Sequence, residues 1–209
     1  MHDYTIGLMS GTSLDGADGV LVDFSGDTLR VVATASQPFT EIFRAELLAL
    51  NTPSHNELHR AALAGNELAA VYAQVVADLV QQAGAQGITA SQISAIGAHG
   101  QTVRHQPRQT PAGPANASYT LQLNNPSLLA ELTGLDVVAD FRSRDVAAGG
   151  QGAPLVPAFH QGVFGRADAQ VAVLNLGGIS NLSLLPPSGA SLPVLGFDCG
   201  PGNALMDAW

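Results

Sequence analysis

The sequence predicts an α/β fold made of two related lobes, the second of which is only begun. The chain opens with short β-branched runs separated by turns rich in Gly, Ser, Thr and Asp, and short apolar strands then alternate with segments of helical periodicity. A second strand–turn–strand pattern starts after Gly165, roughly 165 residues after the first. Because 46% of the 209 residues are hydrophobic and only 12% are charged, the chain can bury a core.

Three antiparallel strands are predicted to open the first lobe. Residues 4–9 and 20–24 are apolar runs on either side of the Asp15-Gly16 dipeptide, which favours a tight hairpin turn. A third strand is expected at 29–35, after the break at Gly26-Asp27.

The later elements follow from apolar spacing and from helix-start signals. Ser54 and Glu57 make a capping box before the longest helical pattern, and Asn125 precedes a proline at the first position of a shorter helix. The predicted elements after the third strand are, in order, helices at 41–50 and 54–84, strands at 93–98 and 119–123, a helix at 126–132, a strand at 136–139, a helix at 157–164, strands at 171–176, 182–185 and 194–197, and a helix at 204–209.

Two segments interrupt this series. Residues 106–118 are rich in Pro, Gln and Ala and are expected to form an exposed loop. The glycine-rich stretch at 149–152 precedes the helix at 157–164. We therefore place a domain boundary there, with a first lobe at 1–155 and a truncated second lobe at 156–209.

The composition excludes several classes of mechanism. The chain has no lysine, and its eight arginines stand against seventeen Asp and Glu residues, for a net charge of −9. A Walker P-loop, a pyridoxal enzyme and a Schiff-base aldolase all need a lysine, and a nucleic-acid partner needs clustered positive charge. One cysteine, no signal-like start and no long apolar run indicate a cytoplasmic protein without a membrane span.

The first hairpin turn is a candidate phosphate site. A glycine-rich hairpin tip brings backbone N–H groups close to a phosphate, and Asp15 and Asp18 could hold Mg²⁺ directly or through water. The same segment also fits an ordinary turn in which Thr12, Ser13 and Asp15 bond their own backbone. The residues of this candidate site are Gly11, Thr12, Ser13, Leu14, Asp15, Gly16, Ala17 and Asp18.

Asp198 is a candidate general base. It is predicted at a strand end, and Cys-Gly-Pro-Gly-Asn follows it before a helix. Strand carboxyl ends and helix N-termini are where α/β folds bind ligands, so this carboxylate could take a proton from a hydroxyl or a water. A helix N-cap is the structural alternative. No His and Cys spacing resembles a zinc site, and Cys199 is not expected to be a nucleophile.

Two further segments gather polar side chains. The cluster at 140–145 is the densest run of charge, and its arginine forks could grip a carboxylate or phosphate; a salt-bridged helix end is the alternative. Arg144 and Asp145 are the candidates taken from it. His99 and Gln101 follow the strand at 93–98 and are added as substrate contacts. The alternative is an ordinary loop in which the histidine finds its hydrogen-bond partners within the protein.

Together these segments resemble the anhydro-N-acetylmuramic acid kinase family. That family has two ribonuclease-H-like lobes of the actin, hexokinase and Hsp70 superfamily, each a mixed sheet flanked by helices, with ATP and sugar between them. Such folds bind ATP phosphates through hairpin amides and Mg²⁺, which fits a chain without lysine. Five motifs carry the resemblance in the same order: Leu8–Asp18, Gly97–His105, Ala139–Leu155, Asn175–Asn181 and Gly196–Asn203.

The resemblance implies an activity and a role for each motif. Members use ATP and water to convert 1,6-anhydro-N-acetylmuramic acid to N-acetylmuramic acid 6-phosphate during peptidoglycan recycling. By this resemblance the loop at 11–18 binds the ATP phosphates, Gly177 and Gly178 lie near them, and Asp198 is the base that activates water. Arg144, with Asp145, would contact the sugar and its lactyl carboxylate.

The length departs from the family, whose members run to about 370 residues by resemblance. A chain that ends inside its second lobe is expected to lack most of the adenosine pocket and to expose apolar strand edges, which favour an intermolecular partner such as a homodimer. Two other functions remain open: a non-catalytic fragment that binds sugar or nucleotide, and a metal-assisted hydrolase that uses Asp15, Asp18 and Asp198.

Overall fold

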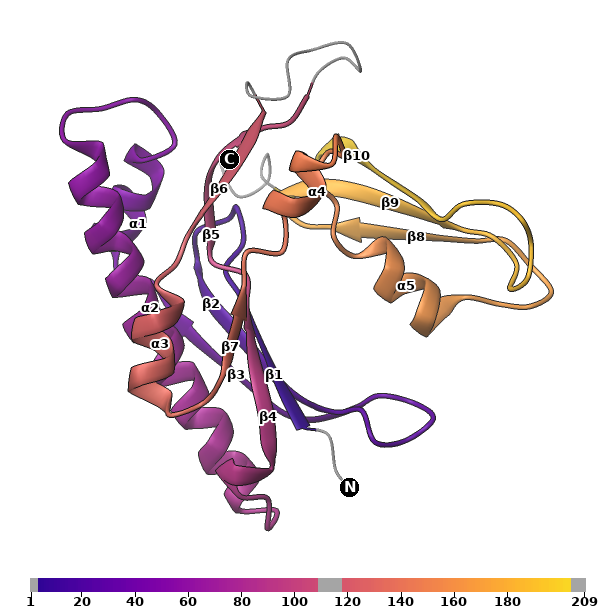
Figure 1. The fold of residues 1–209 in the computed structure, drawn as a ribbon, viewed down its shortest axis with the longest axis horizontal. Coiled ribbons are helices and arrows are strands. Elements are labelled where there is room, and N and C mark those ends of the chain that lie inside the picture. Colours follow the sequence, from indigo (N-terminus) through magenta and orange to yellow (C-terminus); the bar gives the residue numbers. More distant parts are fainter. Residues whose placement is uncertain (1–3, 109–117, 204–209) are drawn as a thin grey trace. The chain divides into compact units, whose positions relative to one another are not determined.

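The chain folds into a mixed α/β structure, as the sequence predicts, and its residues form two compact units. The computed structural model describes residues 4–108 and 118–203 (Figure 1). The first unit holds the described residues up to His105 together with Leu121–Asp140, and the second unit holds the remaining described residues. The boundary at 155/156 between predicted lobes stays a prediction.

A five-stranded mixed sheet forms the centre of the first unit. Its order is β3-β2-β1-β4-β7, in which β1, β2 and β3 are antiparallel neighbours while β4 runs parallel to β1 and β7 parallel to β4. This is the mixed sheet expected of a ribonuclease-H-like lobe. The strands are β1 (Tyr4–Met9), β2 (Gly16–Asp23), β3 (Arg30–Pro38), β4 (Ile93–Ala98) and β7 (Val137–Ala139). Strands β2 and β3 are longer than predicted because their pairing continues to Gly16 and Pro38.

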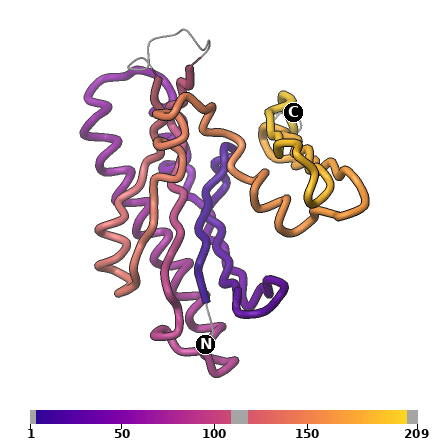
Figure 2. Tube along the Cα trace, turned by 45° about the vertical axis from the view of Figure 1, so that its right-hand side comes forward, coloured from indigo at the N-terminus to yellow at the C-terminus, as the bar shows by residue number. Residues whose placement is uncertain are grey.

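Helices α2 (Glu57–Gly84) and α3 (Pro126–Thr133) pack on this sheet, and α1 (Glu41–Ala49) contacts α2. A 3-10 turn, η1 (Ala90–Gln92), precedes β4. The tube in Figure 2 shows α2 running along the strands, with α3 beside it. The predicted cap of α3 is confirmed, because the Asn125 carboxamide oxygen accepts a hydrogen bond from the Leu128 N–H at 3.0 Å.

The predicted capping box of α2 is only half formed. The Glu57 carboxylate accepts a hydrogen bond from the Ser54 N–H at 3.2 Å, but the Ser54 hydroxyl accepts one from the Arg60 guanidinium at 2.9 Å. The residue that caps the helix is Asn56, in the left-handed conformation with φ 53°. The helix therefore begins at Glu57, because Asn56 and not Ser54 is the last residue outside it.

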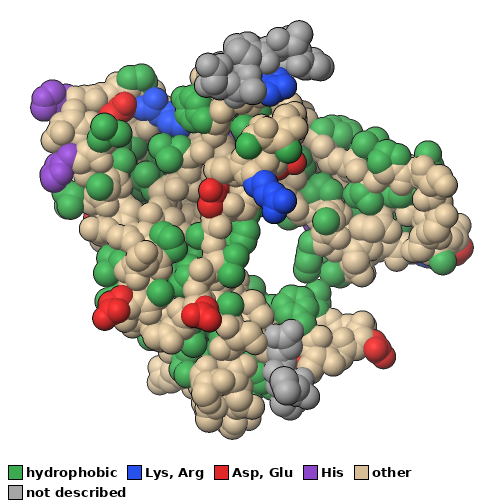
Figure 3. Space-filling model, in the orientation of Figure 1, with side chains coloured by type: hydrophobic (Ala, Val, Ile, Leu, Met, Phe, Trp, Pro, Cys, Tyr) green, Lys and Arg blue, Asp and Glu red, His purple; other side chains and the backbone are tan. Residues whose placement is uncertain are grey.

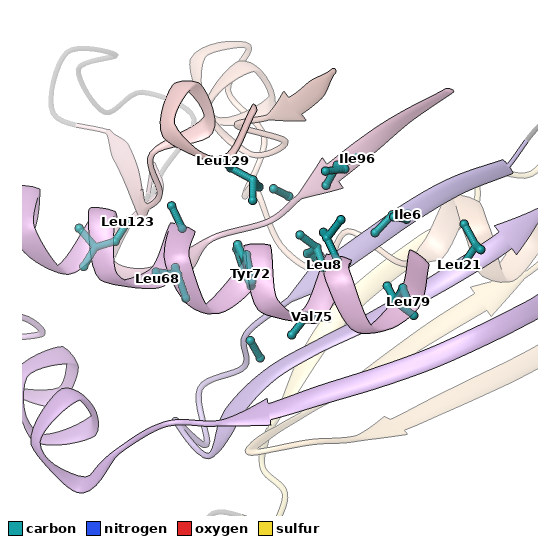
Figure 4. Close-up of a cluster of buried hydrophobic side chains, with 14 of the residues drawn as sticks. Ile6, Leu8, Leu21, Leu68, Tyr72, Val75, Leu79, Ile96, Leu123 and Leu129 are labelled. Carbon is teal, nitrogen blue, oxygen red and sulfur yellow. The ribbon is translucent and has the colours of Figure 1, made fainter. Parts of the chain in front are cut away.

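One hydrophobic core holds the first unit together. Figure 4 shows side chains from the strands meeting a row of α2 side chains. Gly19 of β2 is required by this contact, since a Cβ at that position would overlap Val75. Burial of one Val, Leu or Ile side chain in such a core stabilises the fold by about 1.5–3 kcal/mol. The labelled residues are Ile6, Leu8, Leu21, Leu68, Tyr72, Val75, Leu79, Ile96, Leu123 and Leu129.

The second unit repeats the three-stranded opening of the first. Strands β8 (Val171–Leu176), β9 (Ile179–Leu185) and β10 (Leu195–Pro201) form an antiparallel sheet in the order β10-β9-β8, which matches β3-β2-β1. This confirms the predicted repeat of the strand–turn–strand layout. Helix α5 (Pro157–Phe164) packs on the sheet, where the His160 Nδ1 lies 2.9 Å from the Ser183 hydroxyl.

Three short elements complete the described structure. Strand β6 (Tyr119–Leu123) was predicted, but its partner β5 (Gln101–Gln106) falls where a strand end and a loop were expected. Helix α4 (Ser143–Ala147) fits the alternative interpretation of the 140–145 cluster as a helix end. The predicted helix at 204–209 and most of the predicted loop at 106–118 lie outside the described residues. None of the helices at 4–108 and 118–203 is long and apolar enough to cross a membrane.

Candidate functional site

The predicted site residues fall into two groups. The loop at 11–18, with His99 and Gln101, belongs to the first unit. Arg144, Asp145, the Gly177-Gly178 turn and Asp198 belong to the second unit.

The candidate phosphate loop connects β1 to β2 and has a defined internal shape. The Ser13 hydroxyl donates a hydrogen bond to the Asp15 carboxylate at 2.7 Å, and the Asp15 carbonyl accepts one from the Phe39 N–H at 3.0 Å. Leu14 takes a left-handed conformation with φ 56°, and its buried side chain anchors the loop in the core. Gly16 has no room for a Cβ, because the Gln37 backbone of β3 approaches it closely. The neighbouring strands therefore hold this turn in place.

The two candidate metal ligands of this segment are exposed carboxylates. Asp15 lies in the loop, and Asp18 lies on β2 opposite Met9 and Ser36. Asp18 also lines a hollow of about 730 Å³ beside β1, β2, β3 and β4. Carboxylate oxygens suit Mg²⁺, so the donor chemistry fits the predicted metal. Across residues 4–108 and 118–203 no group of three or more His, Cys, Asp or Glu side chains is placed to hold a metal ion.

His99 and Gln101 lie in a buried polar network at the end of β4. Gln101 is only 1% exposed, and its carboxamide oxygen is buried with no hydrogen-bond partner among the described residues. The His99 Nδ1 lies 2.6 Å from the Gly100 carbonyl, which also accepts a hydrogen bond from the Ser10 hydroxyl at 3.2 Å. Burial raises the pKa of Tyr72, whose hydroxyl lies 3.2 Å from that of Ser10, to about 12. Substrate contact by Gln101 stays a prediction that requires this network to open.

Asp198 lies inside β10 and not at its end. The predicted strand end before Asp198, and the alternative of a helix N-cap, are both wrong, because β10 pairs with β9 up to Pro201. Asp198 is opposite Asn181, which in turn is opposite Asn175 of β8. Paired residues of antiparallel strands share a sheet face, so three polar side chains form a row across this sheet. The Asn181 carboxamide oxygen is buried and has no partner among the described residues.

The Gly177-Gly178 turn lies against the segment that follows Asp198. The Gly202 N–H donates to the Gly178 carbonyl and the Asn203 N–H to the Gly177 carbonyl, both at 2.9 Å. A Cβ on Gly202 would overlap the Gly177 carbonyl, so the close approach requires glycine there. Within the second unit, the structure thus brings together the glycine turn and the strand that carries Asp198.

The two predicted residues of α4 differ in their surroundings. Arg144 is exposed. The Asp145 carboxylate accepts a hydrogen bond from the Gly152 N–H at 2.7 Å, and it fills the space that a side chain on Gly150 would need. Asp145 therefore closes the glycine-rich loop at 149–152.

Arg142, which is not among the predicted site residues, is held by the same loop. Its Nη1 donates a hydrogen bond to the Gly152 carbonyl at 2.6 Å. Burial lowers the pKa of the Arg142 guanidinium, and the negative charge of Asp198 acts in the opposite direction. The charged cluster at 140–145 pointed to this region, but the spacing alone could not tell Arg142 from Arg144.

The sequence comparisons with known proteins agree on one family. A family model described as anhydro-N-acetylmuramic acid kinase matches residues 3–209. The anhydro-N-acetylmuramic acid kinase of Variovorax paradoxus is 66% identical over 206 residues, which cover 98% of this chain and 53% of the relative. The protein of the same name from Albidiferax ferrireducens is 62% identical over 226 residues, with 100% and 56% covered.

This chain therefore spans about half the length of these curated relatives. Among solved structures, an Aquifex aeolicus Ppx/GppA phosphatase is similar with a TM-score of 0.44 and 8% sequence identity, over 95% of this chain and 53% of that one.

Proposed function

The chain belongs to the anhydro-N-acetylmuramic acid kinase family, and we propose from this membership that the full-length gene product phosphorylates 1,6-anhydro-N-acetylmuramic acid with ATP. The observation that carries the proposal is the family match over residues 3–209. The product would be N-acetylmuramic acid 6-phosphate, which places the protein in amino-sugar metabolism and in the recycling of cell-wall peptidoglycan. A cytoplasmic location and a possible homodimer are part of the same proposal.

Asp198 is the proposed general base. Its carboxylate takes a proton from a water that attacks the anomeric carbon of the anhydro sugar. The bond from that carbon to O6 breaks as the new carbon–oxygen bond forms, and O6 accepts the γ-phosphoryl group while ADP leaves. Asp198 is exposed on β10, in the unit that also holds the Gly177-Gly178 turn. This exposure supports the assignment, because water and substrate must be able to reach a general base.

The remaining candidates are assigned to binding. Backbone amides of the loop at 11–18 would hold the ATP phosphates, with Gly177 and Gly178 near them. Asp15 and Asp18 would hold Mg²⁺, which reduces charge repulsion in phosphoryl transfer when it is bound. The exposed Arg144 would hold the lactyl carboxylate, and Asp145 would support this contact by closing the loop at 149–152.

A coupled ATP-turnover assay tests this function. We expect ADP release that depends on the anhydro sugar and that yields a sugar 6-phosphate. Sugar or nucleotide binding without turnover would instead support a non-catalytic protein. Opening of the sugar without ATP would support a metal-assisted hydrolase. Assays of both the 209-residue chain and the full-length gene product separate a failure of the function from a need for further residues.

A further inference from the structure

The cluster at 140–145 contains two arginines, and the structure separates their roles. Arg144 is exposed on α4. Arg142, at the start of the same helix, is partly buried and donates through Nη1 to the Gly152 carbonyl at 2.6 Å. A charge-assisted bond this short fixes the direction of the guanidinium. Of the two, Arg142 is thus the one whose position is set by the fold.

Gly152 is held from both sides. While its carbonyl accepts from Arg142, its N–H donates to the Asp145 carboxylate at 2.7 Å, and the Gly150 N–H donates to the Asp145 carbonyl at 2.8 Å. We call Arg142, Asp145 and Gly152 the Gly152 clamp. The clamp ties α4 to the loop at 149–152, so the Arg142 side chain cannot turn away without breaking it.

The segment after Gly152 packs against the strand that carries Asp198. A Cβ on Gly196 would lie 3.0 Å from the Cγ of Pro154 and would overlap the Cγ of Pro157. Side chains alternate along a strand, so Asp198 points to the same sheet face as Gly196. The Asp198 side chain therefore lies on the face of β10 that Pro154 and Pro157 cover, and these prolines closely follow Gly152 in the chain.

The charges of Arg142 and Asp198 interact across this space. Burial lowers the pKa of the Arg142 guanidinium because desolvation disfavours its charged form, and Asp198 is the carboxylate that opposes this effect. An attraction between opposite charges acts on both side chains, so a guanidinium held in place also favours one direction of the Asp198 carboxylate. A general base must point at the proton that it takes.

We propose that Arg142 is a positioning residue for Asp198, held by Gly152 so that its charge orients the carboxylate toward the water that it deprotonates. This inference rests on the proposed function, in which Asp198 is the base. It assigns the two arginines of the motif to different tasks: Arg142 acts through Asp198, and Arg144 contacts the sugar.

A double-mutant cycle in the full-length gene product tests the inference. We expect Arg142→Gln to lower kcat by about 10- to 100-fold, the usual cost of removing a group that orients a catalytic side chain, with little change in the KM for the sugar. In an Asp198→Asn background the same substitution should lower kcat by less than about threefold, because residues that act as one unit are not additive. Arg142→Lys, which keeps the charge, should recover much of the loss.

Arg166→Gln is the matched control, since Arg166 is an exposed arginine of the same unit that pairs with Asp168 at 3.1 Å. It should leave kcat unchanged. Equal losses from Arg142→Gln in the wild-type and Asp198→Asn backgrounds would overturn the inference and leave the proposed function intact. A kcat for Arg142→Lys as low as that for Arg142→Gln would also overturn the inference.

A wild-type protein without sugar-dependent ATP turnover would overturn the proposed function instead. The same four proteins would then be compared by their unfolding free energies in urea. Coupling between the two substitutions supports the contact between Arg142 and Asp198, and additive effects overturn it.

Discussion

The two units share a three-stranded layout but differ in how much of it they bury. In the first unit the long helix α2 packs on the sheet, and a cluster of fully buried strand and helix side chains forms a closed core. In the second unit, the buried apolar side chains among the described residues are Val146, Leu185 and Pro186. The same pattern of strands thus supports a stable core in one unit and leaves the other short of apolar contacts.

The sheet of the second unit has one face that stays apolar and exposed. Ser183 and Leu185 are buried on the α5 side, whereas residues on the opposite side alternate with them. Four of those are largely exposed: Leu174 at 55%, Leu176 at 68%, Leu195 at 50% and Phe197 at 46%. Green side chains along this sheet are visible in Figure 3. A stretch of exposed apolar side chains of this kind marks a surface that other residues or another chain cover.

The closed core and the proposed general base lie in different units. The first unit carries the core and the candidate phosphate loop at 11–18, and the second carries Asp198, the glycine turn and the Gly152 clamp. Substitutions in the two units should therefore fail in different ways.

The largest effect is expected at Asp198. In the full-length gene product, Asp198→Asn should lower the rate of sugar phosphorylation by about 10²- to 10⁴-fold, since it removes the proposed general base. Nucleotide binding, measured by calorimetry, should stay nearly unchanged. Near-normal turnover would show that another group is the base.

The core of the first unit should respond in the opposite way. Leu79→Ala removes a fully buried side chain of α2 and should lower the free energy of unfolding by about 2–5 kcal/mol. Leu174→Ala, at a position 55% exposed in β8, should change it by about 0.5 kcal/mol or less. Urea unfolding followed by circular dichroism compares the two. Similar losses at both positions would mean that the second unit has a closed core as well.

A smaller effect on binding is expected at Arg144. Arg144→Ala should weaken binding of the anhydro sugar by about tenfold or more, the cost of a lost hydrogen bond to a charged group, and should leave ATP binding unchanged. Isothermal titration with each ligand measures both. Equal losses for sugar and ATP would point to a structural role for Arg144 in α4.

The smallest expected effect is on the pH dependence of stability, and it comes from Asp23 in the first unit. Hydrogen bonds from the Ser25 hydroxyl and N–H, with the Arg30 guanidinium, hold the pKa of Asp23 at about 2, below its ordinary 3.8. A carboxyl whose pKa is depressed in the folded state stabilises the fold above its ordinary pKa, and this stability is lost as the pH falls from about 4 toward 2.

Asp23→Asn should therefore destabilise the chain at pH 5, and the difference from wild type should shrink as the pH falls toward 2. Urea unfolding at several pH values measures it, with Asp27→Asn as a control at an exposed carboxylate of the same β2–β3 connection. A difference that did not depend on pH would contradict the role of the ionised Asp23.

Local patterns predicted much of the fold. The bounds of β1, β4, β6, β8 and α5 agree with the prediction, because alternation and apolar spacing are strong in these segments. Strand β5 (Gln101–Gln106) was missed because all of its residues except Val103 are polar; among the described residues it pairs with β6. The extent of β10 was missed for the same reason: pairing with β9 keeps a glycine-rich polar segment extended.

The sequence indicated which segments form the candidate site, but it did not show which side chains of those segments lie together. The motifs directed attention to 140–145 and to Asp198, but the choice between two arginines depends on the carbonyl of Gly152, which no spacing rule reveals. The row formed by Asn175, Asn181 and Asp198 depends on the register of three strands in the same way. Whether Gln101 is accessible depends on burial, which one sequence does not show.

The stoichiometry of the reaction tests the central claim most directly. The full-length gene product is incubated with ATP and 1,6-anhydro-N-acetylmuramic acid, and the products are followed by phosphorus NMR and mass spectrometry. The account predicts one ADP for each N-acetylmuramic acid 6-phosphate formed, with no excess of inorganic phosphate. Sugar opened without consumption of ATP, or inorganic phosphate released in place of the sugar phosphate, would contradict it.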